Sequence, residues 1–295
     1  MFRGIFVATC ALAVAVVGIA SPAAAKKAAA SPWGTSFVDR DNNGVFSTGD
    51  QDLATVLAAN GGFYNHTSGA RESIVLENVA LTEKEPFYFV NVNGNITVRG
   101  NYTVKGADGM ITFSTVRGDI AIPAGAKVLS KGNLSLQTYS GNMSIGANAQ
   151  ISGSGDFWDT SFTGTTASIG DNVKFSAGGG YHDVTVRGNN SLTVGKNISA
   201  TGPGHGGFRL QTDGDLTIDR INVRLGYIYV LTGHDGIQSR LHISNSTFNQ
   251  TYRNGAAIFS SSNNGAYAPD AIVFTNVTIT SKGGDVRTYP QPIIK

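Results

Sequence analysis

The sequence predicts an all-β protein whose main body is a single-stranded right-handed parallel β-helix of about nine coils, with a short helical cap at its N-terminal end. Three observations lead to this prediction. An apolar strand motif recurs about every 24 residues, the segments between copies alternate apolar and polar residues, and Gly and Asn are frequent between them. Such a period is typical of solenoids, in which each unit buries its apolar face only by stacking on its neighbours.

The repeated unit is an apolar-x-apolar triplet, often preceded by Gly-Asn or Gly-Asp. Seven successive triplets end at residues spaced by 24, 23, 24, 25, 24 and 25 positions, namely Val98, Ile122, Ile145, Ile169, Val194, Ile218 and Ile243. Leu76 ends an earlier copy and Phe274 a later one, at steps of 22 and 31 residues. Helical solenoids are excluded because the segments alternate with a period of two. We therefore expect stacked parallel sheets over about residues 70–282, with the apolar members of each triplet inside.

Asparagines recur at fixed distances after these triplets. They form two sets, one three residues and the other two residues after a triplet: Asn148, Asn172 and Asn197, and Asn78, Asn245 and Asn276. Asn tolerates the left-handed backbone conformation, and its amide can bond the same group one coil away. We expect internal stacks of Asn side chains at the bends of the coils.

Two kinds of repeat carry a family resemblance. Residues 243–248 (ISNSTF) and 274–279 (FTNVTI) resemble coils of the pectate-lyase-like superfamily, and residues 141–149 (GNMSIGANA) are similar to the repeats of filamentous haemagglutinin-type adhesins. The resemblance covers about residues 70–282 and implies a right-handed parallel β-helix. It implies no single activity, because this scaffold carries lyases, hydrolases, adhesins and structural proteins.

Residues 1–25 have the features of a secretory signal peptide. Arg3 precedes an apolar run over 5–20, and Ala23-Ala24-Ala25 is a typical cleavage site. A membrane anchor is the alternative, but the run is shorter than the ~20 residues of a spanning helix. We expect a secreted, cell-surface or periplasmic protein with no transmembrane segment in its mature chain.

Cysteine and charge narrow the function classes. Cys10 lies within the apolar run, so the mature chain would have neither disulfide nor thiolate chemistry. The 22 basic and 20 acidic residues nearly balance, and the only basic pair near the expected cleavage point is Lys26-Lys27. A nucleic acid partner is therefore not expected.

Residues 39–50 (DRDNNGVFSTGD) have the spacing of a calcium-binding loop. Its oxygen ligands would be Asp39, Asp41, Asn43, the Val45 carbonyl, Ser47 directly or through water, and Asp50, with Gly44 at the sharp turn. The loop resembles an EF-hand and, more closely, a dockerin-type loop. It departs from that pattern because Asp50 replaces the usual Glu and residues 31–34 do not suit an entering helix. An Asp/Asn-Gly turn without metal is the alternative.

A short helix should follow this loop. Leu53, Val56 and Leu57 have helical spacing, which predicts a helix over about residues 51–59. This helix would cover the open apolar end of the β-helix, and a structural calcium ion would fix it there. The expected organisation is a signal peptide over 1–25, a linker, loop and capping helix over 26–60, a β-helix over 61–285 and a C-terminal tail over 286–295.

One group of side chains is a candidate for chemistry. Asp159 and Asp183 are 24 residues apart, so they should stack on neighbouring coils about 4.8 Å apart and point outward. Such carboxyl groups can share a proton, hold a cation or act as acid and base. The candidate catalytic residues are Asp159, Asp183 and His182, and the candidate ligand-binding residues are Phe157, Trp158, Tyr181, His205, Tyr252 and Tyr267. Arg187 and Arg209 are expected near the same face. Ordinary strand ends and turns are the alternative, because no recognised catalytic signature is present.

We favour a structural or adhesin-like protein that contacts polysaccharide or another cell-envelope component. The competing hypothesis is a lyase or hydrolase that acts on an acidic glycan. A third is an ice-binding face of small outward residues such as Thr97, Thr193 and Thr217, although Ala121 and Ser144 interrupt it. Residues 249–270 form the longest interruption of the repeat, which is either a contact loop or a disordered bulge.

Overall fold

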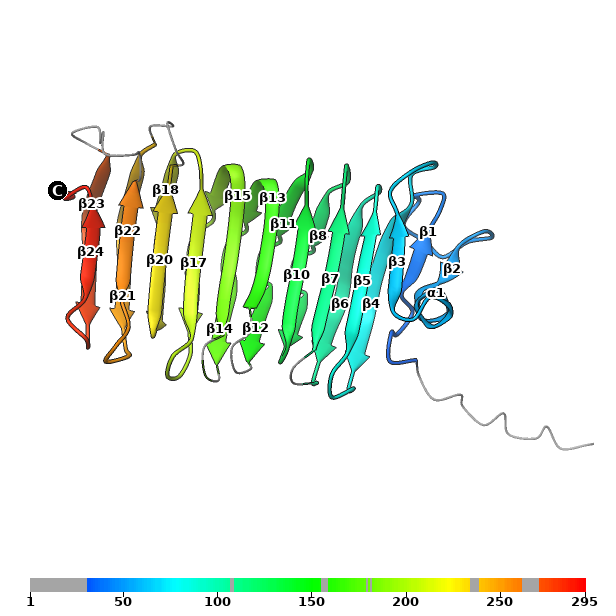
Figure 1. Cartoon of the computed structure of the whole chain (residues 1–295). Helices are drawn as coiled ribbons and strands as arrows, with labels where there is room; N and C mark the ends of the chain where they lie inside the picture. Colours follow the sequence, from blue (N-terminus) through cyan, green and yellow to red (C-terminus); the bar gives the residue numbers. More distant parts are fainter. Residues whose placement is uncertain are drawn as a thin grey trace, which may run out of the picture. The chain divides into compact units, whose positions relative to one another are not determined.

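A computed structural model describes residues 31–106, 109–154, 159–178, 180, 182–233, 239–261 and 271–295. These residues form a parallel β-helix of about nine turns with one short helix, which confirms the predicted fold class (Figure 1). Phe157, Trp158, Tyr181, Tyr267 and the expected signal peptide lie outside the described residues.

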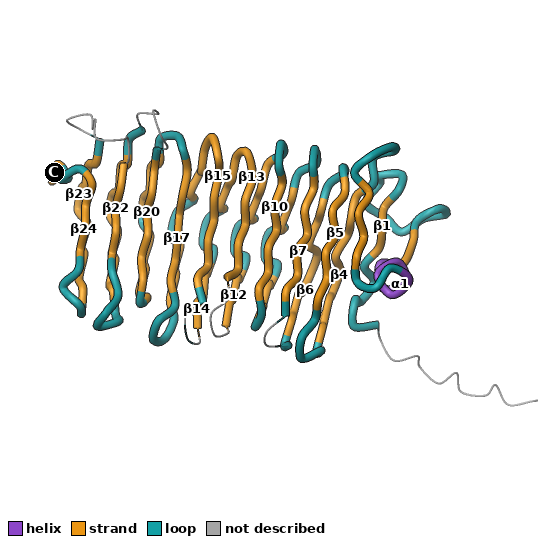
Figure 2. Tube along the Cα trace, viewed as in Figure 1, coloured by secondary structure: helices purple, strands orange, loops and turns teal. Residues whose placement is uncertain are grey.

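The coils build three sheets, which we name A, B and C, and several long strands pass from one sheet to the next (Figures 1 and 2). Sheet A contains the triplets, and its strands are the first parts of β4 (Ser73–Leu81) and β6 (Ile96–Val104), then β8 (Ile120–Ile122), β11 (Asn142–Ile145), the ends of β13 (Asp159–Ile169) and β15 (Asp183–Val194), β18 (Leu216–Asp219), the first parts of β21 (Leu241–Gln250) and β23 (Ile272–Ser281), and β25 (Ile293–Ile294).

Sheet B follows sheet A around each coil. It contains the second parts of β4, β6, β21 and β23 together with β9 (Lys127–Ser130), β12 (Gln150–Ser154), β14 (Lys174–Gly178), β16 (Ile198–Thr201) and β19 (Ile221–Leu225). Sheet C completes the coil with β3 (Phe63–His66), β5 (Phe87–Val92), β7 (Met110–Thr115), β10 (Asn133–Thr138), the first parts of β13 and β15, β17 (Gly207–Thr212), β20 (Tyr227–Thr232), β22 (Ala257–Ser261) and β24 (Val286–Tyr289).

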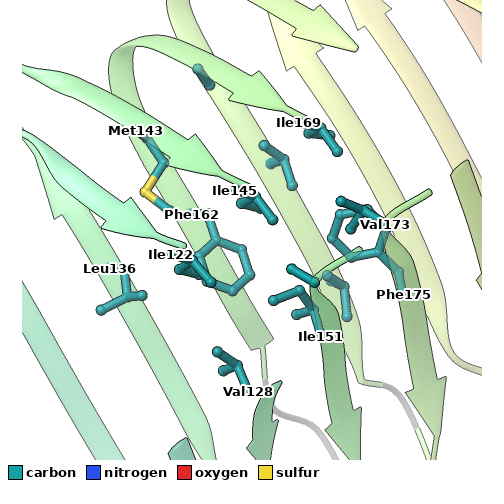
Figure 3. Packing of buried hydrophobic residues seen from close by; sticks show 14 of the residues in the cluster. Ile122, Val128, Leu136, Met143, Ile145, Ile151, Phe162, Ile169, Val173 and Phe175 are labelled. Carbon is teal, nitrogen blue, oxygen red and sulfur yellow. The ribbon is translucent and has the colours of Figure 1, made fainter. Parts of the chain in front are cut away.

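The predicted triplets line the interior. Ile145 pairs with Ile122 on one side and Ile169 on the other, and all three side chains are buried. Aromatic residues from sheets B and C fill the centre, as Figure 3 shows for Phe162 and Phe175. Each apolar row is therefore continuous along the solenoid, which is the arrangement in which stacking buries what a single coil cannot.

Every full coil turns the corner between sheets A and B with one residue in the left-handed conformation. From the first coil to the last these residues are Asn78, Gly100, Gly125, Asn148, Asn172, Asn197, Arg220, Asn245 and Asn276, with φ between 48° and 72°. The Asn172 amide donates to Asn148 Oδ1 at 3.3 Å, and the Asn197 amide donates to Asn172 Oδ1 at 3.2 Å.

The asparagine stacks are present, but they lie on the surface, so the prediction that they are internal is wrong. Asn148, Asn172 and Asn197 are all exposed. The left-handed residue turns its side chain away from the core at this corner. The outer position also lets water satisfy the amide groups that the stack leaves unpaired, whereas burial without partners would cost free energy.

The N-terminal segment closes the first coil. β1 (Phe37–Asp39) runs antiparallel to β4 and also pairs with β2 (Gln51–Asp52). The predicted capping helix is present as α1 (Leu53–Ala59), with Leu53, Val56 and Leu57 buried. Asp52 is its N-cap and accepts from the Thr55 amide at 2.8 Å. An otherwise open sheet edge and apolar end are thereby covered.

Two expectations about the C-terminal region require correction. Residues 286–295 are not a tail, because β24 pairs with β22 and β25 pairs with β23, both in parallel. The interruption at 249–270 also hides a regular strand, β22, over Ala257–Ser261. The sequence pattern missed this strand because a long turn of six residues precedes it and because its apolar and polar residues alternate over only five positions.

Candidate functional site

The outer face of sheet C brings the two predicted carboxylates together. Asp159 pairs directly with Asp183 in the parallel register, as predicted, and both side chains point away from the core. The same outward row continues through Gly207 to Tyr227. The neighbouring outward row contains Thr185, Arg209 and Tyr229, which lie two residues after Asp183, Gly207 and Tyr227 on the same strands.

Asp183 lies at the centre of this arrangement. Burial, with a smaller contribution from the nearby charge of Asp159, raises the pKa of Asp183 to about 6, although Arg209 opposes the shift. A Cβ atom on residue 207 would overlap Asp183 Oδ1, so only glycine at 207 lets this carboxyl group lean over the next coil. Asp183 is thus a carboxyl group that exchanges a proton near neutral pH.

Aromatic side chains border the carboxyl group. The guanidinium carbon of Arg209 lies 4.8 Å from the centre of the Tyr229 ring, and the rings of Tyr227 and Tyr229 are nearly parallel with centroids 6.4 Å apart. The Tyr252 ring lies 3.8 Å from that of His205 and 6.0 Å from that of Tyr227. Burial first, and then the Asp183 charge, raises the pKa of Tyr229. The result is an aromatic and charged surface that extends across neighbouring coils.

His182 does not share this face. Its side chain is fully buried and points inward, and Nε2 lies 2.9 Å from Thr160 Oγ1. Burial lowers the pKa of His182 to about 4, so the ring is neutral at physiological pH. Gly153 leaves the space that the imidazole fills, because a Cβ atom there would overlap the ring. His182 therefore belongs to the core and does not face a ligand on the outer face of sheet C.

The sequence pattern missed Tyr227 and Tyr229. The step from Asp183 to Gly207 is 24 residues, but the step from Gly207 to Tyr227 is only 20, because a single residue, Gly226, joins β19 to β20. A search at the usual period does not align these tyrosines with the carboxylates. Their Tyr-x-Tyr spacing, which marks two side chains on one face of a strand, was the available signal.

The acidic loop forms a second site, beside β1. One carboxylate oxygen from each of Asp39, Asp41 and Asp50 lies within 4.8 Å of the others. Ser47 Oγ donates to Asp41 at 2.9 Å and to Asp50 at 3.1 Å. The Asn43 side-chain oxygen faces its own loop and accepts from the Val45 amide at 2.6 Å. The three carboxylates and the Ser47 hydroxyl therefore converge from one short loop, whereas the Asn43 oxygen is turned toward the Val45 amide.

Asp39 is the buried carboxyl group of this loop. It is only 2% exposed, its Oδ2 accepts from the Gly44 amide at 2.8 Å, and within the described residues its Oδ1 has no hydrogen-bond partner. Burial, together with Asp41 and Asp50, raises the pKa of Asp39. A buried carboxylate oxygen beside two further carboxylates fits a hard cation with oxygen ligands, because such an ion would satisfy the oxygen and offset the repulsion.

Comparisons with known proteins add no assignment. No family model matches the chain, and neither a curated protein nor a solved structure matches it. In the part of the chain that the structure describes, no helix has the length and apolar character needed to cross a membrane. The functional argument therefore rests on the chemistry of the two sites.

Proposed function

We propose that this chain is an exported adhesin-like β-helix, of the pectate-lyase-like architecture, that binds polysaccharide on the outer face of sheet C. The observation that carries this proposal is the Asp183 carboxyl group beside Arg209 and the paired rings of Tyr227 and Tyr229. Aromatic rings offer apolar surface to the faces of sugar rings, while the carboxyl and guanidinium groups bind hydroxyl or acidic substituents. Location in the periplasm, at the cell surface or outside the cell follows from the signal-peptide pattern of residues 1–25.

Binding can be tested on the chain lacking residues 1–25. Its affinity would be measured for polygalacturonate, alginate, xylan and cellulose fragments. We expect Tyr227→Ala and Tyr229→Ala to weaken binding about tenfold each, the effect of losing one stacking contact. Tyr139→Ala, which removes an exposed ring at another corner of the coil, is the matched control. Equal losses in all three variants, or binding to none of the polymers, would contradict the proposal.

The alternative function is cleavage of an acidic glycan, and the carboxyl pair favours it. Burial raises the pKa of Asp183, and two adjacent carboxyl groups in different environments can act as acid and base. The same polymers should then yield new reducing or unsaturated ends, and Asp183→Asn should abolish turnover while binding persists. Binding without any cleavage supports the adhesin.

We also propose that Asp39, Asp41, Asn43, the Val45 carbonyl, Ser47 and Asp50 hold a structural calcium ion that fixes the N-terminal cap. The buried, unpartnered Oδ1 of Asp39 supports this proposal. Calcium at 100 times its Kd should stabilise the fold by about 2.7 kcal/mol, because the unfolded loop does not bind.

The calcium proposal is tested by melting temperature and calorimetry. Calcium should raise the Tm of the parent chain and of the control Glu85→Gln, which changes an exposed acid outside the loop. It should have no effect on Asp39→Asn. No heat of binding and no change in Tm at millimolar calcium would remove the metal from this account.

A further inference from the structure

A second aromatic surface lies on sheet C at the N-terminal end of the solenoid. Phe63, Phe87 and Met110 are 52%, 48% and 43% exposed, which is unusual for large apolar side chains on one face. The Phe63 ring lies 5.3 Å from that of Phe87 and 6.4 Å from that of Phe89. We name these four residues the aromatic patch.

The aromatic patch is in line with the candidate site. Phe87 pairs with Met110, and Met110 pairs with Asn133. The same outward row then passes through Asp159 and Asp183 to Gly207 and Tyr227. Figure 1 shows the strands that carry this row side by side, from β5 to β20. Six strand-to-strand steps of about 4.8 Å place Phe87 about 29 Å from Tyr227 along the solenoid.

A groove of about 510 Å³ adjoins the aromatic patch, between α1 and β5. Phe87, Tyr88, Trp33 and Glu83 line it. The Tyr88 hydroxyl donates to both carboxylate oxygens of Glu83, at 2.8 and 3.0 Å, and this fixes the carboxylate beside the rings. Rings that flank a fixed hydrogen-bond acceptor suit a sugar unit, which presents apolar faces and hydroxyl donors together.

The surrounding charges do not favour a membrane surface. The segment beside the groove contains Glu83, Lys84 and Glu85, and Lys84 forms an ion pair with Glu85. A peripheral membrane surface usually combines apolar side chains with a cluster of basic residues that attract anionic lipids. The mixed charges of residues 83–85 do not form such a basic cluster and are more compatible with a hydroxyl-rich ligand.

We propose that the aromatic patch and its groove are a second subsite for the polysaccharide that binds at Asp183, so that one extended chain lies across the strands of sheet C. The inference rests on the proposed function. Its consequence is a dependence on ligand length, because a chain that reaches both subsites binds the second at high effective concentration. Chains longer than about 29 Å should bind at least tenfold more tightly than short ones.

The test uses alginate and xylan oligosaccharides fractionated by length, as acidic and neutral probes. Phe63→Ala/Phe87→Ala should remove the extra affinity of the long chains and leave the affinity for short ones unchanged. Tyr227→Ala should weaken both. Phe46→Ala, which removes an exposed ring on the acidic loop, is the matched control. Met110→Ser provides a second variant of the patch if the double variant has a lowered Tm.

The outcomes separate the two proposals. Short chains that bind with no gain for longer ones overturn the second subsite and leave the proposed function intact. Absence of binding by every fraction overturns both. If the parent chain dimerises in light scattering and Phe63→Ala/Phe87→Ala is monomeric, the patch joins two copies of the protein, and the second subsite is wrong.

Discussion

Asp183 should lower the stability of the fold at neutral pH. Its pKa is about 6 in the folded chain and near 3.8 when unperturbed, so the folded state binds this proton more tightly than the unfolded state. At 1.36 kcal/mol per pKa unit, the difference corresponds to about 3 kcal/mol. Because part of the carboxyl group is exposed and screened by water, we expect about 2 kcal/mol.

The pH dependence follows from the same two values. Below pH 3.8 both states are protonated and Asp183 has no effect on the free energy of unfolding. The folded state loses its favourable proton as pH rises through about 6. Above that pH the buried, charged carboxylate lowers the free energy of unfolding by the full amount. Asp183→Asn mimics the neutral carboxyl group, so it should be about 2 kcal/mol more stable than the parent at about pH 8 and equal to it at about pH 3.

Urea denaturation at both pH values measures this difference, and a carboxyl NMR titration of Asp183 measures its pKa directly. Asp159→Asn is the internal control, because removing the neighbouring charge should lower the pKa of Asp183 and reduce the gain from Asp183→Asn. If Asp183→Asn instead destabilises the fold at alkaline pH, the carboxylate is held by a favourable ion pair with Arg209. The reasoning from burial is then refuted.

Three further predictions concern the coil, each measured by urea denaturation. Phe208→Ala should cost about 3–5 kcal/mol, because it leaves a cavity beside the Phe175 ring, whose centroid lies 5.0 Å away. Asn172→Ala should cost about 2 kcal/mol, since it loses the two side-chain hydrogen bonds of the stack and Ala tolerates the left-handed conformation less well than Asn; an unchanged stability would contradict the role of the stack. Arg220→Asn should gain about 0.5–1 kcal/mol, because Arg220 is the one left-handed corner residue among the described coils that is neither Asn nor Gly, and a loss would show that its contact with Asp219 matters more.

The sequence was most informative where one chemical requirement repeats in every coil. The triplets revealed the sheet A register because each must bury two apolar side chains, and the Asn spacing revealed a left-handed corner. The pattern did not show that every described coil has a left-handed residue at this corner, because in three coils the residue is not Asn. These residues are Gly100, Gly125 and Arg220. The pattern also did not reveal the antiparallel β1, because parallel and antiparallel strands show the same alternation of apolar and polar residues.

The candidate site was predictable only in part for a similar reason. The Asp159 and Asp183 pair kept the 24-residue step and was found, whereas Tyr227 was displaced by the short connection at Gly226. The inward position of His182 follows from alternation with Val184, yet a histidine beside a carboxylate suggested chemistry. Local composition identified the residues, and only the three-dimensional register separated those that face a ligand from those that fill the core.

The corner between sheets A and B has a consequence for how this molecule can change. Each coil passes it with one left-handed residue, whereas the connections at both borders of sheet C differ in length. The connection from sheet B to sheet C has one residue between β19 and β20 but six residues between β21 and β22. The connection from sheet C to sheet A needs no residues in the continuous strand β13, but it has eight residues between β20 and β21. The corner opposite the proposed binding face therefore sets the pitch, and the borders of that face are free to vary. Longer or shorter loops that contact a different ligand can be accommodated there without disturbing the stacking of the turns.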